Sequence, residues 1–378
     1  MSVFKFEDIA VNSTEKKKPV DQDKHTYLGL EHLDSDSIYV TRFGAETAPK
    51  GDKLIMKKGD VLFGKRRAYQ KKVAIAPFDG IFSAHGMVLR PKEEVIDKNF
   101  FPMFIKSDYF LDAAIKISVG SLSPTINWRD LKELKFELPS LEEQRKLAKV
   151  LWAIYDMKDK YKKLILATDN LVKSQFIEMF KDEFETCLKL KMNKAFDLQM
   201  GKTPSRADSS LWQSEDQKWV SIADMSTYEK YTEDTKEYIS DYAIGKTGMK
   251  IVPANTVIMS FKLTIGRTAI TSEDIYTNEA IMAFIQKSDL FEVDYLRWAL
   301  HFTDWLSGVQ NAVKGSTLNK SIIGNMEIPI PSKALQNKFL EFAEQSDKSK
   351  CALQEAIKDL DALSKKIIAE NLIPAGKE

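Results

Sequence analysis

The clearest chemical signal in the sequence is a cluster of basic and amide side chains with no acid beside it. Residues 61–78 contain neither Asp nor Glu, and the segment FGKRRAYQKKVAIA within them carries five Lys and Arg residues. Lysine suits a phosphate, arginine bonds guanine through two N–H groups, and a glutamine amide matches adenine. The predicted nucleic-acid contacts of this segment are Lys65, Arg66, Arg67, Tyr69, Gln70, Lys71 and Lys72. The alternative is a solvated edge strand that its charges protect from aggregation.

The second half of the chain has polar strips of its own. Residues 242–272 also lack acids and include the strip MSFKLTIGRTAIT. The segments GKTPSR and KGSTLNKS combine cations and hydroxyl groups with glycine, whose freedom lets a backbone amide approach a phosphate. The predicted contacts here are Lys202, Thr203, Ser205, Arg206, Lys262, Arg267, Lys314, Ser316 and Lys320, with Ser121 of VGSLS as the first-half counterpart of KGSTL.

We find no sequence motif typical of a catalytic site. The segment SDYAIGKTG ends like a phosphate-binding loop, but Ser240 stands where that loop requires its first glycine. The four histidines are scattered, and Cys187 and Cys351 have no second ligand at metal-binding spacing. We therefore expect a chain that performs no catalysis and holds no cofactor and no metal of its own.

Composition sets further limits on the kind of protein. The 56 Lys and Arg residues nearly balance the 55 Asp and Glu residues, so the basic strips are local features. Because non-specific DNA binding grows with the number of neutralised phosphates, we expect weak DNA affinity for the isolated chain. No apolar run approaches the ~18 residues of a membrane span, and the first residues lack the apolar core of a signal peptide. We expect a cytoplasmic protein.

The sequence segments that we expect to position these residues occur twice in the chain. The segment ELPSLEEQRKLAKVL returns as EIPIPSKALQNKFLEFA, GDVLFGK returns as NTVIMSF, and YLGLEHL returns as WVSIADM. Their order is kept, so we infer one duplicated unit. The aligned positions at the start of the first pair are Pro139 with Pro331, Ser140 with Ser332, and Gln144 with Gln336.

Each copy changes its periodicity after the proline. Short strand-like runs and a helix at residues 99–115 or 293–309 precede it, and apolar residues spaced three and four apart follow it. Ser140 and Glu143 form the pattern of a capping box, whereas the second copy has Leu335 at the glutamate position and keeps only half of the cap. We predict helices of about 40 residues, far longer than the globular mean.

The predicted fold class is α+β, with two recognition domains related by pseudo-two-fold symmetry and separated by a pair of long antiparallel coiled-coil helices. The predicted segments are a first domain at residues 1–139, a central helix at 140–182, a second domain at 183–331 and a C-terminal helix at 332–378. The alternative is a helical hairpin in the core of a single globule.

The repeated proline, serine and glutamine, preceded by VGSLS and INWRDLKELKFELP, resemble the specificity subunit of type I restriction-modification systems over essentially the whole chain. The resemblance implies that each domain recognises one half of a bipartite DNA target and that the helices set the spacing. It also implies docking of two methyltransferase subunits, which use S-adenosylmethionine, and of two restriction and translocase subunits, which use ATP and Mg. The partner-docking positions that it implies are Leu141, Gln144, Leu147, Leu151, Leu335, Gln336 and Phe339. The competing function is a coiled-coil adaptor that binds only protein.

Overall fold

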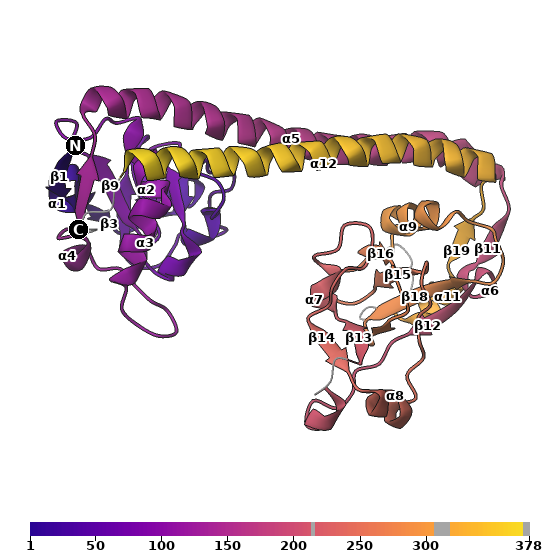
Figure 1. The fold of residues 1–378 in the computed structure, drawn as a ribbon. Coiled ribbons are helices and arrows are strands. Elements are labelled where there is room, and N and C mark those ends of the chain that lie inside the picture. Colours follow the sequence, from indigo (N-terminus) through magenta and orange to yellow (C-terminus); the bar gives the residue numbers. More distant parts are fainter. Residues whose placement is uncertain (213–215, 306–317, 373–378) are drawn as a thin grey trace. The chain divides into compact units, whose positions relative to one another are not determined.

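The chain forms two compact units in a computed structural model that describes residues 1–212, 216–305 and 318–372 (Figure 1). Unit 1 consists of Met1–Lys163 and Leu353–Glu378, and unit 2 consists of Leu164–Ala352. Within the described residues no helix is both long and apolar enough to cross a membrane. Each of the two long helices is divided between the units, with one half in unit 1 and the other half in unit 2.

Unit 1 opens with short strands and turns, followed by helices that cover them. Its elements are β1 (Ser2–Lys5), α1 (Phe6–Ile9), β2 (Ala10–Ser13), β3 (Lys16–Lys17), η1 (Asp21–Thr26), β4 (Tyr27–Leu28), η2 (Leu30–His32), β5 (Lys53–Met56), β6 (Val61–Phe63), η3 (Ala68–Gln70), β7 (Val73–Ile75), β8 (Gly80–Phe82), β9 (Met87–Pro91), α2 (Phe100–Lys106), α3 (Asp108–Lys116), α4 (Trp128–Leu131), β10 (Lys135–Leu138) and the start of α5 (Leu141–Thr186). The strands form sheets of order β2-β9-β6-β7, β3-β5-β8-β4 and β1-β10.

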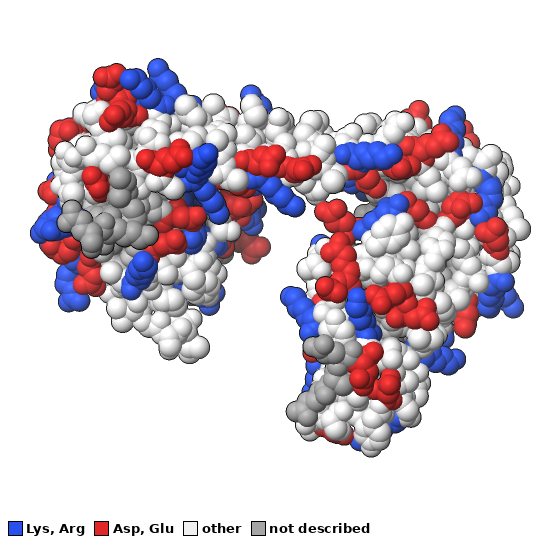
Figure 2. Space-filling view, viewed as in Figure 1, with Lys and Arg blue, Asp and Glu red and all other residues white. Residues whose placement is uncertain are grey.

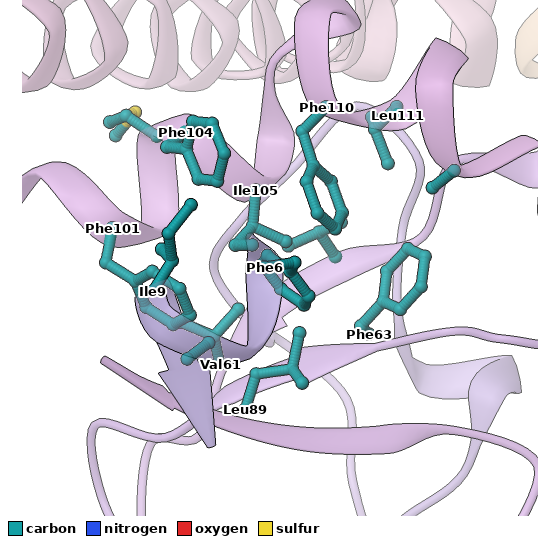
Figure 3. Packing of buried hydrophobic residues seen from close by; sticks show 14 of the residues in the cluster. Phe6, Ile9, Val61, Phe63, Leu89, Phe101, Phe104, Ile105, Phe110 and Leu111 are labelled. Atoms are coloured by element: carbon teal, nitrogen blue, oxygen red, sulfur yellow. The ribbon is translucent and has the colours of Figure 1, made fainter. Parts of the chain in front are cut away.

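Aromatic rings fill the core of unit 1 (Figure 3). Phe6 of α1 lies 5.0 Å from Phe110 of α3, and Phe104 of α2 lies 5.2 Å from Phe136 of β10, measured between ring centroids. These contacts fasten α1, which follows the first strand, and β10, the last strand, to α3 and α2. The β1–β10 pair closes the chain segment immediately before α5 begins.

Unit 2 repeats this order of elements. They are β11 (Lys189–Lys191), α6 (Met192–Ala195), β12 (Phe196–Met200), η4 (Ser209–Leu211), β13 (Gln217–Val220), α7 (Ile222–Met225), β14 (Glu237–Ile239), α8 (Asp241–Thr247), β15 (Val257–Ser260), β16 (Thr268–Ile270), β17 (Tyr276–Thr277), β18 (Ile281–Gln286), α9 (Val293–Phe302), α11 (Lys320–Asn325), β19 (Glu327–Pro329) and the start of α12 (Lys333–Asn371).

The predicted duplication is confirmed by the strand order and pairing of two sheets and by a shared parallel strand pair. The sheet β12-β18-β15-β16 has the order and the antiparallel pairings of β2-β9-β6-β7, and β11-β19 repeats β1-β10. The parallel pair β13–β17 corresponds to β4–β8. The units differ at the edge of this last sheet, where β14 adds beside β13 in unit 2 and β5 adds beside β8 in unit 1.

The two long helices are antiparallel. In unit 1 the start of α5 packs with the end of α12, where Leu372 is buried in the same cluster as Leu151. In unit 2 the end of α5 packs with the start of α12, and the rings of Phe176 and Phe339 lie 5.2 Å apart. Each unit therefore has its own core, and the alternative of a hairpin inside a single globule is wrong.

The starts of both helices follow the sequence prediction. Ser140 and Glu143 form the reciprocal capping box, with the Ser140 amide donating to the Glu143 carboxylate at 3.0 Å. In the second copy the Leu335 amide donates to the Ser332 hydroxyl, and the Ser332 amide donates instead to Glu183 of α5. A carboxylate from the other long helix thus replaces the missing glutamate.

Gln144 makes three hydrogen bonds inside unit 1. Its carbonyl accepts from the Asp97 amide at 2.8 Å, and its amide donates to the carbonyls of Val95 and Pro139 at 3.1 and 2.9 Å. Only 1% of its surface is exposed. The amide ties the start of α5 to the loop before α2 and to the residue that precedes the helix.

Gln336 repeats this network in unit 2. Its carbonyl accepts from the Glu292 amide at 2.8 Å, and its amide donates to Leu290 and Pro331 at 3.0 and 2.9 Å. The repeated sequence pattern is therefore the record of a repeated buried network.

Three predicted element boundaries differ from the structure. The helix predicted at residues 293–309 ends at Phe302 as α9, and residues 306–309 lie outside the described residues. The helix predicted at residues 99–115 is two helices, because Ser107 adopts an extended backbone and accepts a bond from the Phe110 amide as the cap of α3. The central helix predicted to end at residue 182 continues to Thr186.

We predict that Gln144→Ala lowers the free energy of unfolding of unit 1 by about 2–3 kcal/mol, because three buried bonds to backbone groups are lost. Denaturant unfolding measures the loss, and hydrogen exchange at residues 95–97 locates it. Lys149→Ala, an exposed change on the same helix, serves as the control and leaves both quantities unchanged. Equal protection of the Asp97 amide in Gln144→Ala and in the control contradicts the prediction.

Candidate nucleic-acid interface

The predicted basic segment of unit 1 forms the loop between β6 and β7. The two strands pair from Val61 with Ile75 to Phe63 with Val73, and residues 64–72 connect them through η3. Arg67 and Lys71, on either side of η3, have φ values of 54° and 49°. Non-glycine residues in this left-handed region carry strain of about 1–2 kcal/mol, which is typical of functional sites. The loop therefore holds its side chains in a defined arrangement at the end of the sheet.

Four cations gather at this loop without a counter-acid. They are Lys16, Lys65, Arg66 and Arg67, which we call the cationic patch. Among the described residues no carboxylate lies within ion-pair distance of any of them. The Arg66 guanidinium instead donates to the Ser123 hydroxyl at 3.0 Å and lies 3.5 Å from the His85 ring nitrogen.

The titration of neighbouring groups reflects this excess of positive charge. Burial and the nearby Lys16 lower the pKa of Lys65. Burial, followed by Arg66, Lys65 and Lys53, lowers the pKa of His85. Since each cation disfavours the charged form of its neighbour, an anion bound here relieves repulsion already present in the free protein.

Two of the predicted cations already have partners in the free protein, and their contact with a nucleic acid stays a prediction. Lys71 bonds both Asp108 and Asp112 of α3 at 2.8 Å, and Lys72 donates to the Leu30 carbonyl at 2.6 Å. The segment lacks acids in sequence, but α3 supplies them in space. Both lysines brace the loop, but only the charge of Lys71 is paired with carboxylates, because Lys72 bonds a neutral carbonyl.

The remaining predicted contacts of unit 1 lie at the surface. Tyr69 is 57% exposed, so its ring is open to a base, and Gln70 is half-buried beside it. Ser121 is exposed in the loop between α3 and α4. Sequence reasoning missed Lys16 and His85, which the sheet brings to the patch from distant parts of the chain.

In unit 2, the segment GKTPSR is held by its own neighbours. The Arg206 guanidinium forms two bonds to the Glu237 carboxylate, and its central carbon lies 3.7 Å from the ring centroid of Trp212. Lys202 donates to the carbonyls that end α8, at 2.7 Å for Thr247, and Thr203 bonds Glu279. The predicted contacts Lys202, Thr203 and Arg206 thus stabilise unit 2, while Ser205 is exposed.

The loop between β15 and β16 is the unit 2 counterpart of the β6–β7 loop. Lys262 is exposed on it, and Arg267 donates to the Ser226 carbonyl at 2.8 Å, which orients its partly free guanidinium. Leu263, with a φ of 63°, takes the left-handed conformation that Arg67 has in unit 1. Lys320 is exposed at the start of α11. The predicted contacts Lys314 and Ser316 lie outside the described residues.

The predicted partner-docking positions fall into a buried group and a half-buried group. Gln144, Gln336, Leu151 and Phe339 are at most 2% exposed and serve the cores of their own units, so their side chains offer no surface to a partner. The resemblance implies docking at these positions only through their place at the start of each long helix. For the half-buried Leu141, Leu147 and Leu335, docking stays a prediction.

The site offers binding surfaces and no metal centre. Across residues 1–212, 216–305 and 318–372, no group of three His, Cys, Asp or Glu side chains is placed to hold a metal ion. The segment that ends like a phosphate loop is the helix α8, capped by Ser240 and terminated by Gly248 at a φ of 59°. Figure 2 shows acidic and basic side chains interspersed over the face in view.

Comparison with known proteins gives the same family for both halves. The model of the type I restriction modification DNA specificity domain matches residues 3–167 and 190–360. The specificity subunit of the type I restriction enzyme EcoDI from Escherichia coli is 26% identical over 188 residues, which cover 48% of this chain and 42% of that protein. The MjaIX specificity subunit from Methanocaldococcus jannaschii is 26% identical over 37% of this chain and 33% of its own length. The matches thus span less than half the length of these two relatives.

Solved structures share the fold over nearly the entire chain. A chain from a study of assembly and conformational transition of the type I restriction-modification system has a TM-score of 0.56 at 17% identity, covering 98% of this chain and 97% of its own length. The S subunit from M. genitalium has a TM-score of 0.50 at 13% identity, covering 97% and 95%. At these identities the likeness concerns the fold alone.

We predict that Arg66→Gln raises the pKa of His85, because one of the cations that disfavour the imidazolium is removed. With four histidines in the chain, the ring signals are resolved by NMR, and a pH titration measures the shift. Lys98→Gln, an exposed change beyond the opposite end of the sheet, is the control and leaves the pKa of His85 unchanged. An unaltered His85 titration in Arg66→Gln refutes the electrostatic account of the patch.

Proposed function

Because the chain belongs to the family of the type I restriction modification DNA specificity domain, we propose that it is the DNA-recognition subunit of a type I restriction-modification complex. Each unit binds one half of a bipartite DNA target. The observation that carries this proposal is the family match in both units, combined with an unpaired cationic patch on the β6–β7 loop of unit 1.

The patch has the chemistry that a DNA duplex requires. Among the described residues no carboxylate pairs with its cations, so a phosphate binds them without breaking an existing ion pair. Arg66 and Arg67 have forked donors for phosphate oxygens and for acceptors on base edges, and Tyr69 offers a ring beside them. Lys65, at the start of the loop, contacts the sugar-phosphate backbone of the DNA. Phosphate contacts position the duplex, and the arginines contribute sequence preference.

The equivalent loops of the two units carry different side chains on the same frame. Unit 1 places Arg66 and Arg67 between its strands, and unit 2 places Lys262 and Leu263 at the corresponding turn. Since base preference follows the donors and acceptors on the loop, the units recognise different sequences. The target is therefore asymmetric, with unlike halves.

The chain itself performs no catalysis in this proposal and takes no cofactor. Two methyltransferase subunits dock on it and use S-adenosylmethionine, and two restriction and translocase subunits use ATP and Mg. The exposed face at the start of α5, with Glu142, Lys146 and Val150, and the half-buried Leu141 and Leu147 form one docking surface. The paired helices connect the two recognition units and set the spacing of the half-sites.

Charge reversal at the patch tests DNA recognition. We expect Arg66→Glu with Arg67→Glu to weaken DNA retention by the assembled complex by about tenfold or more and to lower the slope of log affinity against log salt, because phosphate contacts are lost. Filter binding or fluorescence anisotropy at several salt concentrations measures both. The duplex is the target that methylation mapping of the host genome identifies.

The matched control reverses the same number of charges elsewhere on unit 1. Lys92→Glu with Lys98→Glu changes two cations that follow β9, away from the loop, and neither forms an ion pair among the described residues. Assembly with the modification subunits stays intact in both variants, as size-exclusion chromatography reports. Full DNA retention by the Arg66 and Arg67 variant in an intact complex supports the protein-only adaptor and removes the proposed function.

A further inference from the structure

The two most exposed large apolar side chains of the described chain are leucines at loop tips. Leu122 of unit 1 is 93% exposed and Leu263 of unit 2 is 89% exposed, whereas the next value is 65% for Val119. Leu122 lies in the loop between α3 and α4, which projects from unit 1 (Figure 1). Leu263 lies in the β15–β16 loop. A leucine in this position contributes no buried area to the fold.

The backbone around Leu122 is ordered by its own hydrogen bonds. Val119 and Thr125 exchange amide-to-carbonyl bonds at 2.9 and 3.0 Å, so the loop closes as a narrow hairpin with Leu122 near its tip. Gly120 has a φ of 112°, which a residue with a side chain rarely adopts, and permits the sharp turn. Pro124 further restricts the returning strand. Leu122 is thus held near the tip of a hydrogen-bonded hairpin.

This hairpin is joined to the cationic patch. Arg66 pairs through its backbone with Thr125, and its guanidinium donates to the Ser123 hydroxyl at 3.0 Å. The Ala68 amide also donates to the Pro124 carbonyl at 3.2 Å. Residues 117–128 carry no charge of their own. An uncharged tip therefore stands directly beside free cations.

We propose that Leu122 is an apolar wedge that enters the minor groove of the bound half-site and partly unstacks one base step. The inference rests on the proposed function and adds a way of reading DNA that the basic residues do not supply. Apolar side chains inserted between base pairs from the minor groove kink the duplex, and adjacent arginines favour the negative potential of that groove. Arg66 holds the base of the hairpin while the patch neutralises the flanking phosphates.

Unit 2 carries an equivalent device of independent construction. Leu263 is flanked by the exposed Lys262, and its backbone is held in the left-handed region by the bonds of the Gly266 amide and the Ser260 hydroxyl across the turn. The wedge of unit 2 therefore lies on the β15–β16 hairpin, whereas the wedge of unit 1 lies on the α3–α4 loop beside the β6–β7 hairpin. Flexible base steps such as TA and CA are deformed most readily, so each wedge selects for one of them in its half-site.

The test uses the full chain in complex with its modification subunits and the mapped target duplex, with 2-aminopurine placed in turn at each position of the unit 1 half-site outside the methylated adenine. We expect the wild-type complex to raise the fluorescence several-fold at one step. Leu122→Ala abolishes that rise and weakens binding about tenfold, while Leu122→Phe keeps both. Leu166→Ala, a 64% exposed leucine of α5, is the control and changes neither.

The outcomes separate this inference from the function on which it rests. An unchanged fluorescence rise in Leu122→Ala overturns the wedge, as does the absence of any rise in the wild type. Weaker binding with the rise retained also overturns it, since the unstacking then does not depend on Leu122. If Arg66→Glu with Arg67→Glu still weakens binding in these cases, DNA recognition stands without the wedge. If that variant binds normally, the proposed function itself fails.

Discussion

A buried glutamine amide at the start of each long helix is the interaction on which the arrangement of each unit depends. The amide has one acceptor and two donors, and all three bond to backbone groups of the preceding domain and of the residue before the helix. The network is buried. If the helix left in another direction, these polar groups would lose their hydrogen-bond partners, at a cost of about 1–3 kcal/mol each. The network therefore fixes the direction in which the helix leaves its own domain. The same network at Gln336 gives the second copy the same exit direction.

Duplication left this frame unchanged and freed the loops to diverge. The four-stranded sheet, the closing two-stranded sheet and the glutamine network agree between the units. The β6–β7 and β15–β16 turns join equivalent strands in the two units, yet one carries arginines and the other a lysine and a leucine. A loop fixed at both ends by a sheet can change its side chains without disturbing the core, which is why recognition surfaces are so often built this way.

Much of the frame was predictable because its causes are local. The capping box at Ser140 and Glu143, the basic β6–β7 hairpin and the long helices follow from spacing that a linear pattern records. The fate of individual cations was not predictable, because their partners are distant in sequence. Lys71 meets two aspartates of α3, and Arg206 stacks on Trp212 against Glu237. An acid-free stretch of sequence is therefore a poor measure of free charge, since folding brings in counter-charges from other elements.

The division of the chain into units has a consequence for its synthesis. Unit 2 is one continuous stretch, Leu164–Ala352, whereas the core of unit 1 includes Leu372 from the far end of α12. During translation unit 2 has all of its residues before unit 1 does, although unit 1 begins first. The core of unit 1 stays incomplete until the last turns of α12 and Leu372 leave the ribosome. The usual order, in which the first domain made is the first one finished, is reversed in this protein.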